Sequence, residues 1–205
     1  MDTTRQYGNH DDMVDFKSMT TVDGAPRLIT VEDFDRMIAA DIFDEDERIE
    51  LVEGAFVSYA PPQGDEHAYA VWRFPEAIRE RLGARAILRA QSPVIVSKIT
   101  VLEPDLTVLR PREDRYRRRP VPADVLAVVE IGVSSLARDR SQKLRLYAES
   151  GIPEYWVVDV LGRRIETFRQ PAGAAYAVPR AVAGGDSIAF EAFPDVVFSV
   201  DELLG

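Results

Sequence analysis

The sequence predicts a single α/β domain, because short apolar runs typical of buried strands alternate along the chain with longer segments of helical periodicity. Residues 125–131 form the clearest strand pattern, since the run is too short and too β-branched for a helix. Residues 66–82 and 138–150 carry the clearest helical patterns. A chain of 205 residues suffices for one complete hydrophobic core, so we expect one domain over residues 28–205.

The N-terminal part divides into an arm and a short helix. Residues 1–27 lack hydrophobic periodicity and are typical of a flexible arm. Thr30 is the expected N-cap of the following helix, with Asp33 as its capping-box partner. We expect this helix to bury a stripe formed by Phe34, Met37 and Ile38.

A hairpin and the first long helix come next. Residues 48–59 predict a hairpin that turns near residues 53–54, and the prolines and glycine within 61–64 mark a loop. Residues 66–82 predict a helix, in which Pro75 indicates a kink or a later start because proline lacks the backbone N–H group.

The second half of the chain alternates strands with one more helix. Strands are predicted at 86–91, 93–96, 104–109 and 125–131. The helix over 138–150 ends at a glycine and a proline that prevent its continuation. Residues 154–159 and 163–169 should then pair as strands, and a terminal β region ends in a short turn at 200–204.

Composition excludes several kinds of site. The chain has no cysteine, so disulfides and thiolate metal ligands are absent, and two histidines make a histidine-rich zinc site an unfavourable interpretation. No apolar run has membrane-spanning length, and the polar, acidic N-terminus does not resemble a signal peptide. We therefore expect a cytoplasmic protein.

The charge distribution bears on nucleic acid as a partner. A net charge of −10 argues mildly against it, because phosphate contacts require Lys and Arg. A local basic segment can nevertheless guide a polyanion on an acidic protein. Such a segment is formed by Arg110, Arg112, Arg115, Arg117, Arg118 and Arg119.

Two acidic residues within apolar strand patterns point to a metal site. Glu130 interrupts the run 125–131, and Asp105 lies in the apolar stretch 101–109. A buried carboxylate costs several kcal/mol unless it is paired or bound to metal. If the two strands are adjacent, both carboxylates can share a Mg²⁺ ion. Lys143, on the helix that follows, could orient an attacking water or neutralise charge in the transition state.

Each of these residues also has a simpler interpretation. Pro-Asp is a common dipeptide, so Asp105 alone indicates little, and a single Glu at a strand end is usually in a salt bridge. Asp139 and Lys143 alone would form an i,i+4 surface pair, and His67 would act as a cap or hydrogen-bonding group. Only the combination of these residues, in this order, favours a catalytic site.

The sequence VEIGVSSLARDRSQKLRLYA, residues 129–148, is followed by GIPEYWVVD at 151–159, and together they resemble the signature of the Uma-two family of restriction-endonuclease-like proteins. Residues 48–54, the two prolines before His67, and Pro104 with Asp105 match the family in the same order. The resemblance covers about residues 28–204.

This resemblance implies a PD-(D/E)xK nuclease core with a mixed central β-sheet flanked by helices, here with extra N-terminal and C-terminal β-hairpins. Asp105 and Glu130 match the metal-binding acids of the family. Gly132 stands where the motif lysine is expected, and Lys143 matches a lysine that has moved to the following helix. The resemblance also suggests catalytic roles for Glu50 and His67; with the three residues above they complete the set Asp105, Glu130, Lys143, Glu50 and His67.

The expected function is that of an endonuclease dependent on Mg²⁺, with Mn²⁺ as the alternative ion, that hydrolyses phosphodiester bonds of DNA. Residues 110–119 would approach the phosphate backbone, and a homodimer would supply one site for each strand. The alternative is a catalytically silent module on the same fold that binds nucleic acid or protein. A third interpretation is a structural assembly protein, in which arginines would engage Asp105 and Glu130.

Overall fold

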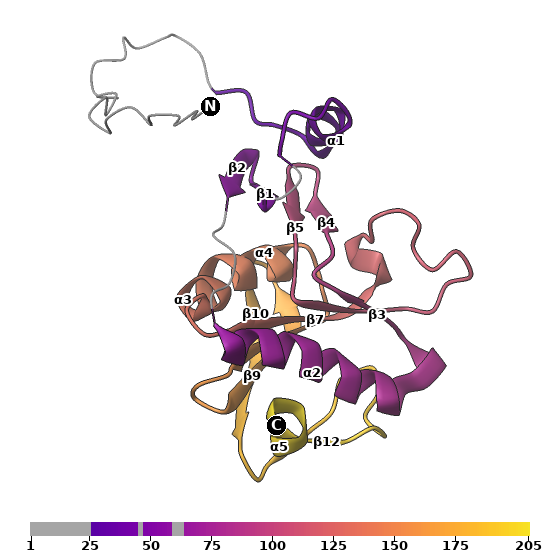
Figure 1. Ribbon diagram of the computed structural model, residues 1–205, viewed down its shortest axis with the longest axis vertical. Coiled ribbons are helices and arrows are strands. Elements are labelled where there is room, and N and C mark those ends of the chain that lie inside the picture. Colours follow the sequence, from indigo (N-terminus) through magenta and orange to yellow (C-terminus); the bar gives the residue numbers. More distant parts are fainter. Residues whose placement is uncertain (1–25, 45–46, 59–63) are drawn as a thin grey trace, which may run out of the picture.

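The computed structural model describes residues 26–44, 47–58 and 64–205. The predicted flexible arm therefore lies almost wholly outside the described residues, as does most of the predicted loop at 61–64. The described part contains two main sheets that meet at the candidate site, with helices on both faces of the larger sheet (Figure 1).

The larger sheet has six strands in the order β10-β9-β8-β7-β6-β3. Its parallel pair is β7 with β8, and its other neighbouring strands are antiparallel, so the sheet is mixed as predicted. A parallel pair requires a crossover connection, which the helical segment after β7 provides. The bounds of the strands are β3 Ile87–Ala90, β6 Leu106–Leu109, β7 Val125–Gly132, β8 Glu154–Asp159, β9 Arg164–Ala172 and β10 Ala175–Ala183.

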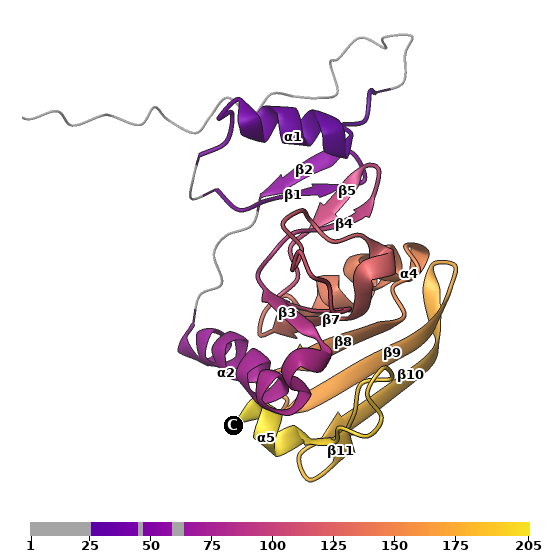
Figure 2. The ribbon, with the colours of Figure 1, turned by 90° about the vertical axis from the view of Figure 1, so that its right-hand side faces the viewer.

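The smaller sheet is built from the first half of the chain, in the order β2-β1-β5-β4. Helix α1, Val31–Ala39, covers it and contributes the aromatic contact between Phe34 and Phe56, whose ring centroids are 5.5 Å apart (Figure 2). The strand bounds are β1 Ile49–Val52, β2 Ala55–Ser58, β4 Val94–Ser97 and β5 Thr100–Leu102. Two short strands, β11 Ser187–Ile188 and β12 Phe198–Ser199, form a separate pair.

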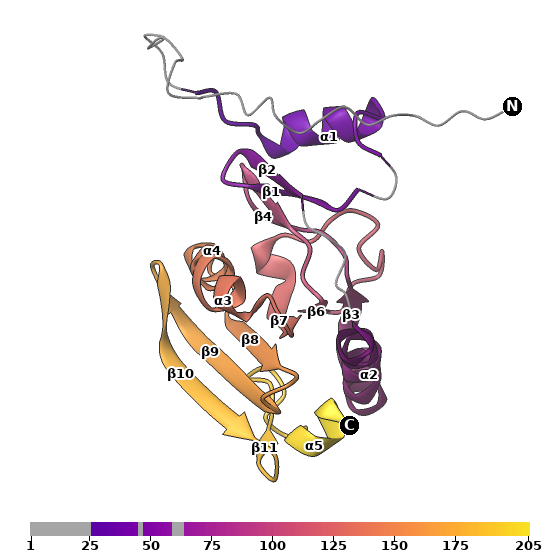
Figure 3. The same ribbon diagram turned by 60° about the vertical axis from the view of Figure 1, so that its left-hand side comes forward.

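Helices flank the larger sheet on opposite faces (Figure 3). Helix α2, Asp65–Leu82, covers one face together with the last helix, α5, Val200–Leu204. The other face carries α3, Leu136–Arg138, the π-helical turn η4, Asp139–Lys143, and α4, Leu144–Glu149. Two short 3₁₀ turns are η2, Gly83–Arg85, and η3, Pro122–Asp124. Within the described residues, no helix combines the length and apolar character needed to cross a membrane.

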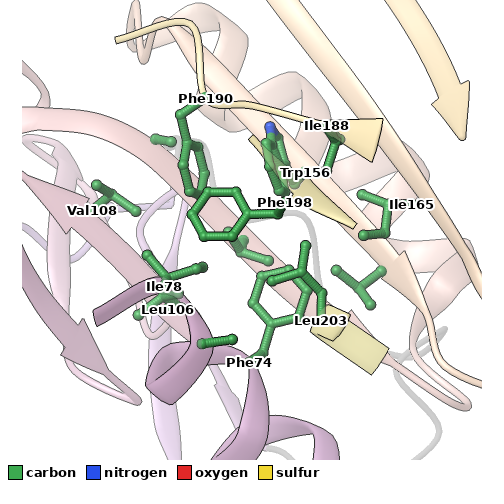
Figure 4. Packing of buried hydrophobic residues seen from close by; sticks show 14 of the residues in the cluster. Phe74, Ile78, Leu106, Val108, Trp156, Ile165, Ile188, Phe190, Phe198 and Leu203 are labelled. Carbon is green, nitrogen blue, oxygen red and sulfur yellow. The ribbon is translucent and has the colours of Figure 1, made fainter. Parts of the chain in front are cut away.

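The face under α2 holds the aromatic part of the core (Figure 4). Trp156 of β8 stacks on Phe190 with ring centroids 4.1 Å apart, and Phe74 of α2 meets the edge of the same indole. Phe198 and Ile78 are also fully buried in this cluster. Deleting one of these aromatic side chains would cost about 3–5 kcal/mol.

The opposite face of β7 positions the site. Side chains alternate along a strand, so Val129 and Ile131 pack toward α2 whereas Val128 packs in the cluster beneath α4. Glu130 shares the face of Val128, and it is 3% exposed. The same apolar pattern that makes β7 a buried strand therefore buries a carboxylate under α4.

Four local predictions require correction. The apolar stretch 101–109 is two strands in different sheets, because residues 103–105 cross from β5 to β6. Helix α2 does not start after Pro75 but runs through it from Asp65, and the proline ring is buried. Ile38 is 49% exposed, because α1 packs only on the small sheet, while its capping box between Thr30 and Asp33 is confirmed. The predicted final turn is the helix α5.

Candidate active site

A pocket of about 350 Å³ lies where the two sheets meet. The strand β1 of the small sheet, the crossing at 103–105, the end of β7, the start of α2 and the turn η4 all contribute to its lining. Charged and ionisable side chains dominate this lining: the acids are Glu50, Glu103, Asp105, Glu130 and Asp139, and the basic residues are Arg48, His67, Arg138 and Lys143.

Asp105 joins the two strands that carry the predicted metal ligands. Its Oδ2 accepts a hydrogen bond of 2.8 Å from the backbone N–H group of Ile131, the residue after Glu130. Burial raises the pKa of Asp105, and that bond together with the nearby charge of Lys143 opposes the rise. Because β6 and β7 are adjacent, the structure brings Asp105 next to Glu130 as the sequence predicted.

Glu130 is held by two donors from the helical segment above β7. Its Oε1 accepts hydrogen bonds from Lys143 Nζ at 2.7 Å and from the Tyr147 hydroxyl at 2.8 Å. Burial raises the pKa of Glu130 to about 8, although the charge of Lys143 opposes this effect. The assembly-protein interpretation expected arginines to engage Glu130, and the observed partner is a lysine instead.

Lys143 is buried, with 3% of its surface exposed, and projects from the π turn. Burial alone lowers the pKa of Lys143, but the carboxylates of Glu130 and Glu50 outweigh it and hold that pKa above its usual value. The Glu50 Oε1 atom lies 3.6 Å from Lys143 Nζ. Lys143 is therefore a buried cation within the site, and the interpretation of Asp139 and Lys143 as a surface pair is wrong.

The position of Gly132 explains why the lysine comes from the helix. A Cβ atom at residue 132 would lie 2.7 Å from Leu136 Cδ2 and 3.0 Å from Ser135 Oγ. The side chains of Leu136 and Ser135, in the turn into α3, thus occupy the space that a side chain at residue 132 would need. A lysine two residues after Glu130 would require these side chains to shift, whereas Lys143 reaches Glu130 from the helical segment above β7.

Glu50 and His67 both reach the pocket, from the small sheet and from α2 respectively. Glu50 Oε1 accepts a hydrogen bond of 2.8 Å from the Glu103 N–H group, and its Oε2 is buried without a hydrogen-bond partner among the described residues. The Nε2 atom of His67 is likewise buried and finds no partner in the described part of the chain. Unpaired buried polar atoms are costly, so these two atoms mark a place for a ligand or water.

The arginines that line the pocket are ones that the sequence analysis did not select. Arg48 lies two residues before Glu50 and pairs with Glu103 at 2.9 Å, and Arg138 lies 3.6 Å from Glu50 Oε2. The sequence offered two indications of these arginines. Each lies within a segment that resembles the family, and Arg48 stands two residues before Glu50, so the alternation of side chains leading into β1 places the two on the same face.

The arginine segment 110–119 does not line the pocket. It follows the end of β6 that is remote from Asp105 and leads into the start of β7. Arg112 pairs there with Asp114 and Asp124, and Arg119 pairs with Asp35. Contact between segment 110–119 and the phosphate backbone stays a prediction. Such a contact would involve phosphates away from the bond that is cleaved, because the segment does not line the pocket.

The donor set fits a divalent ion that keeps part of its hydration shell. Among the described residues, no group of three or more acidic or histidine side chains is placed to hold a metal ion. Mg²⁺ is commonly bound by one or two carboxylates, with water and substrate phosphate as the remaining ligands. Asp105 and Glu130 supply two such carboxylates, and Glu50 Oε2, which accepts no hydrogen bond among the described residues, adds a buried acceptor beside them.

The fold and this arrangement define a restriction-endonuclease-like protein. The solved structure of a protein from Anabaena variabilis ATCC 29413, described as a "putative nuclease belonging to DUF820", shares the fold with a TM-score of 0.66 and 16% sequence identity. The similarity covers 86% of this chain and 97% of that one. The chain belongs to the Uma2 family, described as "Putative restriction endonuclease", whose family model matches residues 31–201. A comparison with curated proteins finds no match.

Proposed function

We propose that this protein is a metal-dependent endonuclease that hydrolyses phosphodiester bonds of DNA, with Asp105 and Glu130 as the ligands of Mg²⁺ or Mn²⁺. The observation that carries the proposal is the convergence of Asp105, Glu130 and Lys143 in one pocket, from two adjacent strands and the helix between β7 and β8. Family membership supports nuclease activity in general, and the chemistry of these side chains supports the metal and the role of the lysine.

Different side chains of the pocket would perform different steps of phosphodiester hydrolysis. A divalent ion, when bound, lowers the pKa of water and stabilises charge on the phosphate. Lys143 holds a fixed positive charge beside Glu130 and can neutralise charge that develops on the phosphate oxygens. His67 Nε2 is the accessory group suited to accept a proton within the pocket, and Glu50 fixes Lys143 and Arg138 from the opposite wall.

We further propose a cytoplasmic homodimer. The described residues of one chain form one such pocket at the junction of the two sheets, and cleavage of both strands of a duplex is most simply achieved by two copies. This part of the proposal rests on analogy at the level of the fold.

The test is cleavage of supercoiled, nicked and branched DNA by the purified chain with Mg²⁺, Mn²⁺ or EDTA. Asp105→Asn and Glu130→Gln should each lower the rate by at least about 100-fold, because each removes the negative charge of a metal ligand while conserving volume. Glu149→Gln on the exposed side of α4 is the matched control and should keep the wild-type rate. Cleavage by Glu130→Gln at the wild-type rate would refute the assignment.

A catalytically silent binding module is the second candidate. Lys143 already donates a hydrogen bond to Glu130, so the described site can persist without an ion. This candidate predicts that DNA binding survives in Lys143→Met and that neither Mg²⁺ nor Mn²⁺ changes the unfolding temperature.

A further inference from the structure

Asp139 is the pocket acid that neither the predicted metal site nor the lysine explains. Its side chain is 1% exposed, and it lines the pocket beside Lys143. The Oδ2 atom accepts a hydrogen bond of 2.6 Å from Ser135 Oγ. The Oδ1 atom is buried and has no hydrogen-bond partner within the described residues. One half of this carboxylate is therefore fixed and the other half is left free toward the pocket.

The π turn η4 places this carboxylate. Asp139 opens the turn and Lys143 closes it, so one short segment supplies both a buried anion and a buried cation to the pocket. The Tyr155 hydroxyl donates to the backbone carbonyl of Asp139 at 3.1 Å and ties the turn to β8. π turns inside helices occur frequently at functional sites, where they redirect side chains.

Basic residues near Asp139 are engaged with other acids of the pocket. Lys143 donates to Glu130 and lies 3.6 Å from Glu50, and Arg138 forms an ion pair with Glu50. Burial is the main cause that raises the pKa values of Asp105 and Glu130, and the Asp139 carboxylate adds to both. Asp105, Glu130 and Asp139 thus line one pocket, and a buried acceptor without a hydrogen bond is unfavourable.

We propose that Asp139 completes the cation site as a positioning residue: its Oδ1 accepts a hydrogen bond from a water in the hydration shell of the divalent ion held by Asp105 and Glu130. This inference rests on the proposed function. Contact through water, and not direct ligation, follows because no three acidic side chains of the described residues are placed around one ion. Mg²⁺ keeps several waters in protein sites, and groups that orient such a shell typically contribute 10–100-fold to affinity.

The experiment is titration of Mn²⁺ into the full chain, followed by the electron paramagnetic resonance signal of free Mn²⁺. Asp139→Asn should bind Mn²⁺ about 10–100-fold more weakly than the wild type. Asparagine conserves the volume and the acceptor for Ser135, so it replaces only the free oxygen by an N–H donor. Glu149→Gln, ten residues along the same helical segment and exposed, should bind as the wild type does.

Ser135→Ala is the second variant, because it keeps the charge of Asp139 and removes its anchor. We expect a measurable loss of affinity, up to about tenfold, and a small fall in the unfolding temperature because the buried Oδ2 atom of Asp139 loses its donor. It also keeps the inference testable if Asp139→Asn does not fold.

The outcomes distinguish failure of the metal site from failure of the role of Asp139. If the wild type binds no Mn²⁺, the proposed metal site fails and this inference fails with it. If the wild type binds and folded Asp139→Asn binds equally well, the role of Asp139 is refuted while the site at Asp105 and Glu130 stands. If Asp139→Asn is unfolded, wild-type affinity in Ser135→Ala refutes the role.

Discussion

Replacing Lys143 by methionine tests whether the buried pair at the centre of the site is electrostatic. Methionine has nearly the same length as lysine and fills the same space without a charge. The change leaves the Glu130 carboxylate with the Tyr147 hydroxyl as its remaining donor, and it removes one of the two cations near Glu50. The packing around residue 143 is retained, so the effect isolates the loss of the cation.

The size of the effect follows from burial. Removing one partner of a buried ion pair typically costs about 3–5 kcal/mol, because the other charge is left uncompensated. For a chain of this length 1 kcal/mol lowers the unfolding temperature by about 2–4 °C, so at pH 9, where Glu130 is ionised, we expect a fall of about 6–20 °C.

The loss of stability in Lys143→Met should depend on pH, because it depends on whether Glu130 is ionised. Burial raises the folded-state pKa of Glu130 from 4.5 to about 8, so its contribution to stability is complete below about pH 4.5 and is lost as the pH rises through about 8. Lys143 opposes that rise, and without it the pKa of Glu130 increases further. The variant should therefore be destabilised more at pH 9 than at pH 5.

Thermal and urea unfolding, followed by circular dichroism at both pH values, measure this difference. Arg145→Met is the matched control, because Arg145 pairs with Glu53 and Glu149 at the surface, where a pair contributes about 0–1 kcal/mol. An unfolding temperature for Lys143→Met equal to that of the wild type at pH 9 would refute the electrostatic account of the site.

Three further predictions concern the metal, the covered end of β7 and the N-terminal helix. The affinity for Mg²⁺ should rise as the pH rises from 6 to about 8, because binding displaces a proton from Glu130. Calorimetry in buffers of different ionisation enthalpy measures the release of this proton, and an affinity independent of pH would contradict the prediction. Gly132→Ala should cost about 1–3 kcal/mol in urea unfolding, because its Cβ would lie 2.7 Å from Leu136 Cδ2, and unchanged stability would show that the turn yields freely. Thr30→Ala should cost about 1 kcal/mol through loss of the capping box with Asp33 and leave Mn²⁺ binding unaltered, whereas weaker binding would show that α1 supports the site.

Local sequence determined the elements that hold most of the site. The apolar, β-branched run around Glu130 ensured a buried strand, and the glycine and proline after residue 150 ensured that the next helix ended in time to return as β8. Such patterns are set by neighbours within a few residues, so a single sequence suffices to read them. The order of Asp105, Glu130 and Lys143 along these elements likewise indicated their shared pocket.

Tertiary structure alone decided which other charges join them. The pairing of β1 with β5 splits the stretch 101–109 between two sheets and brings Glu50 and Arg48 to the pocket, whereas the end of β6 carries residues 110–119 away from it. The π turn converts Asp139 from an apparent surface residue into a buried acid. The physical reason is that burial and charge pairing here depend on contacts between residues about fifty positions apart, and local hydrophobic periodicity carries no information about those contacts.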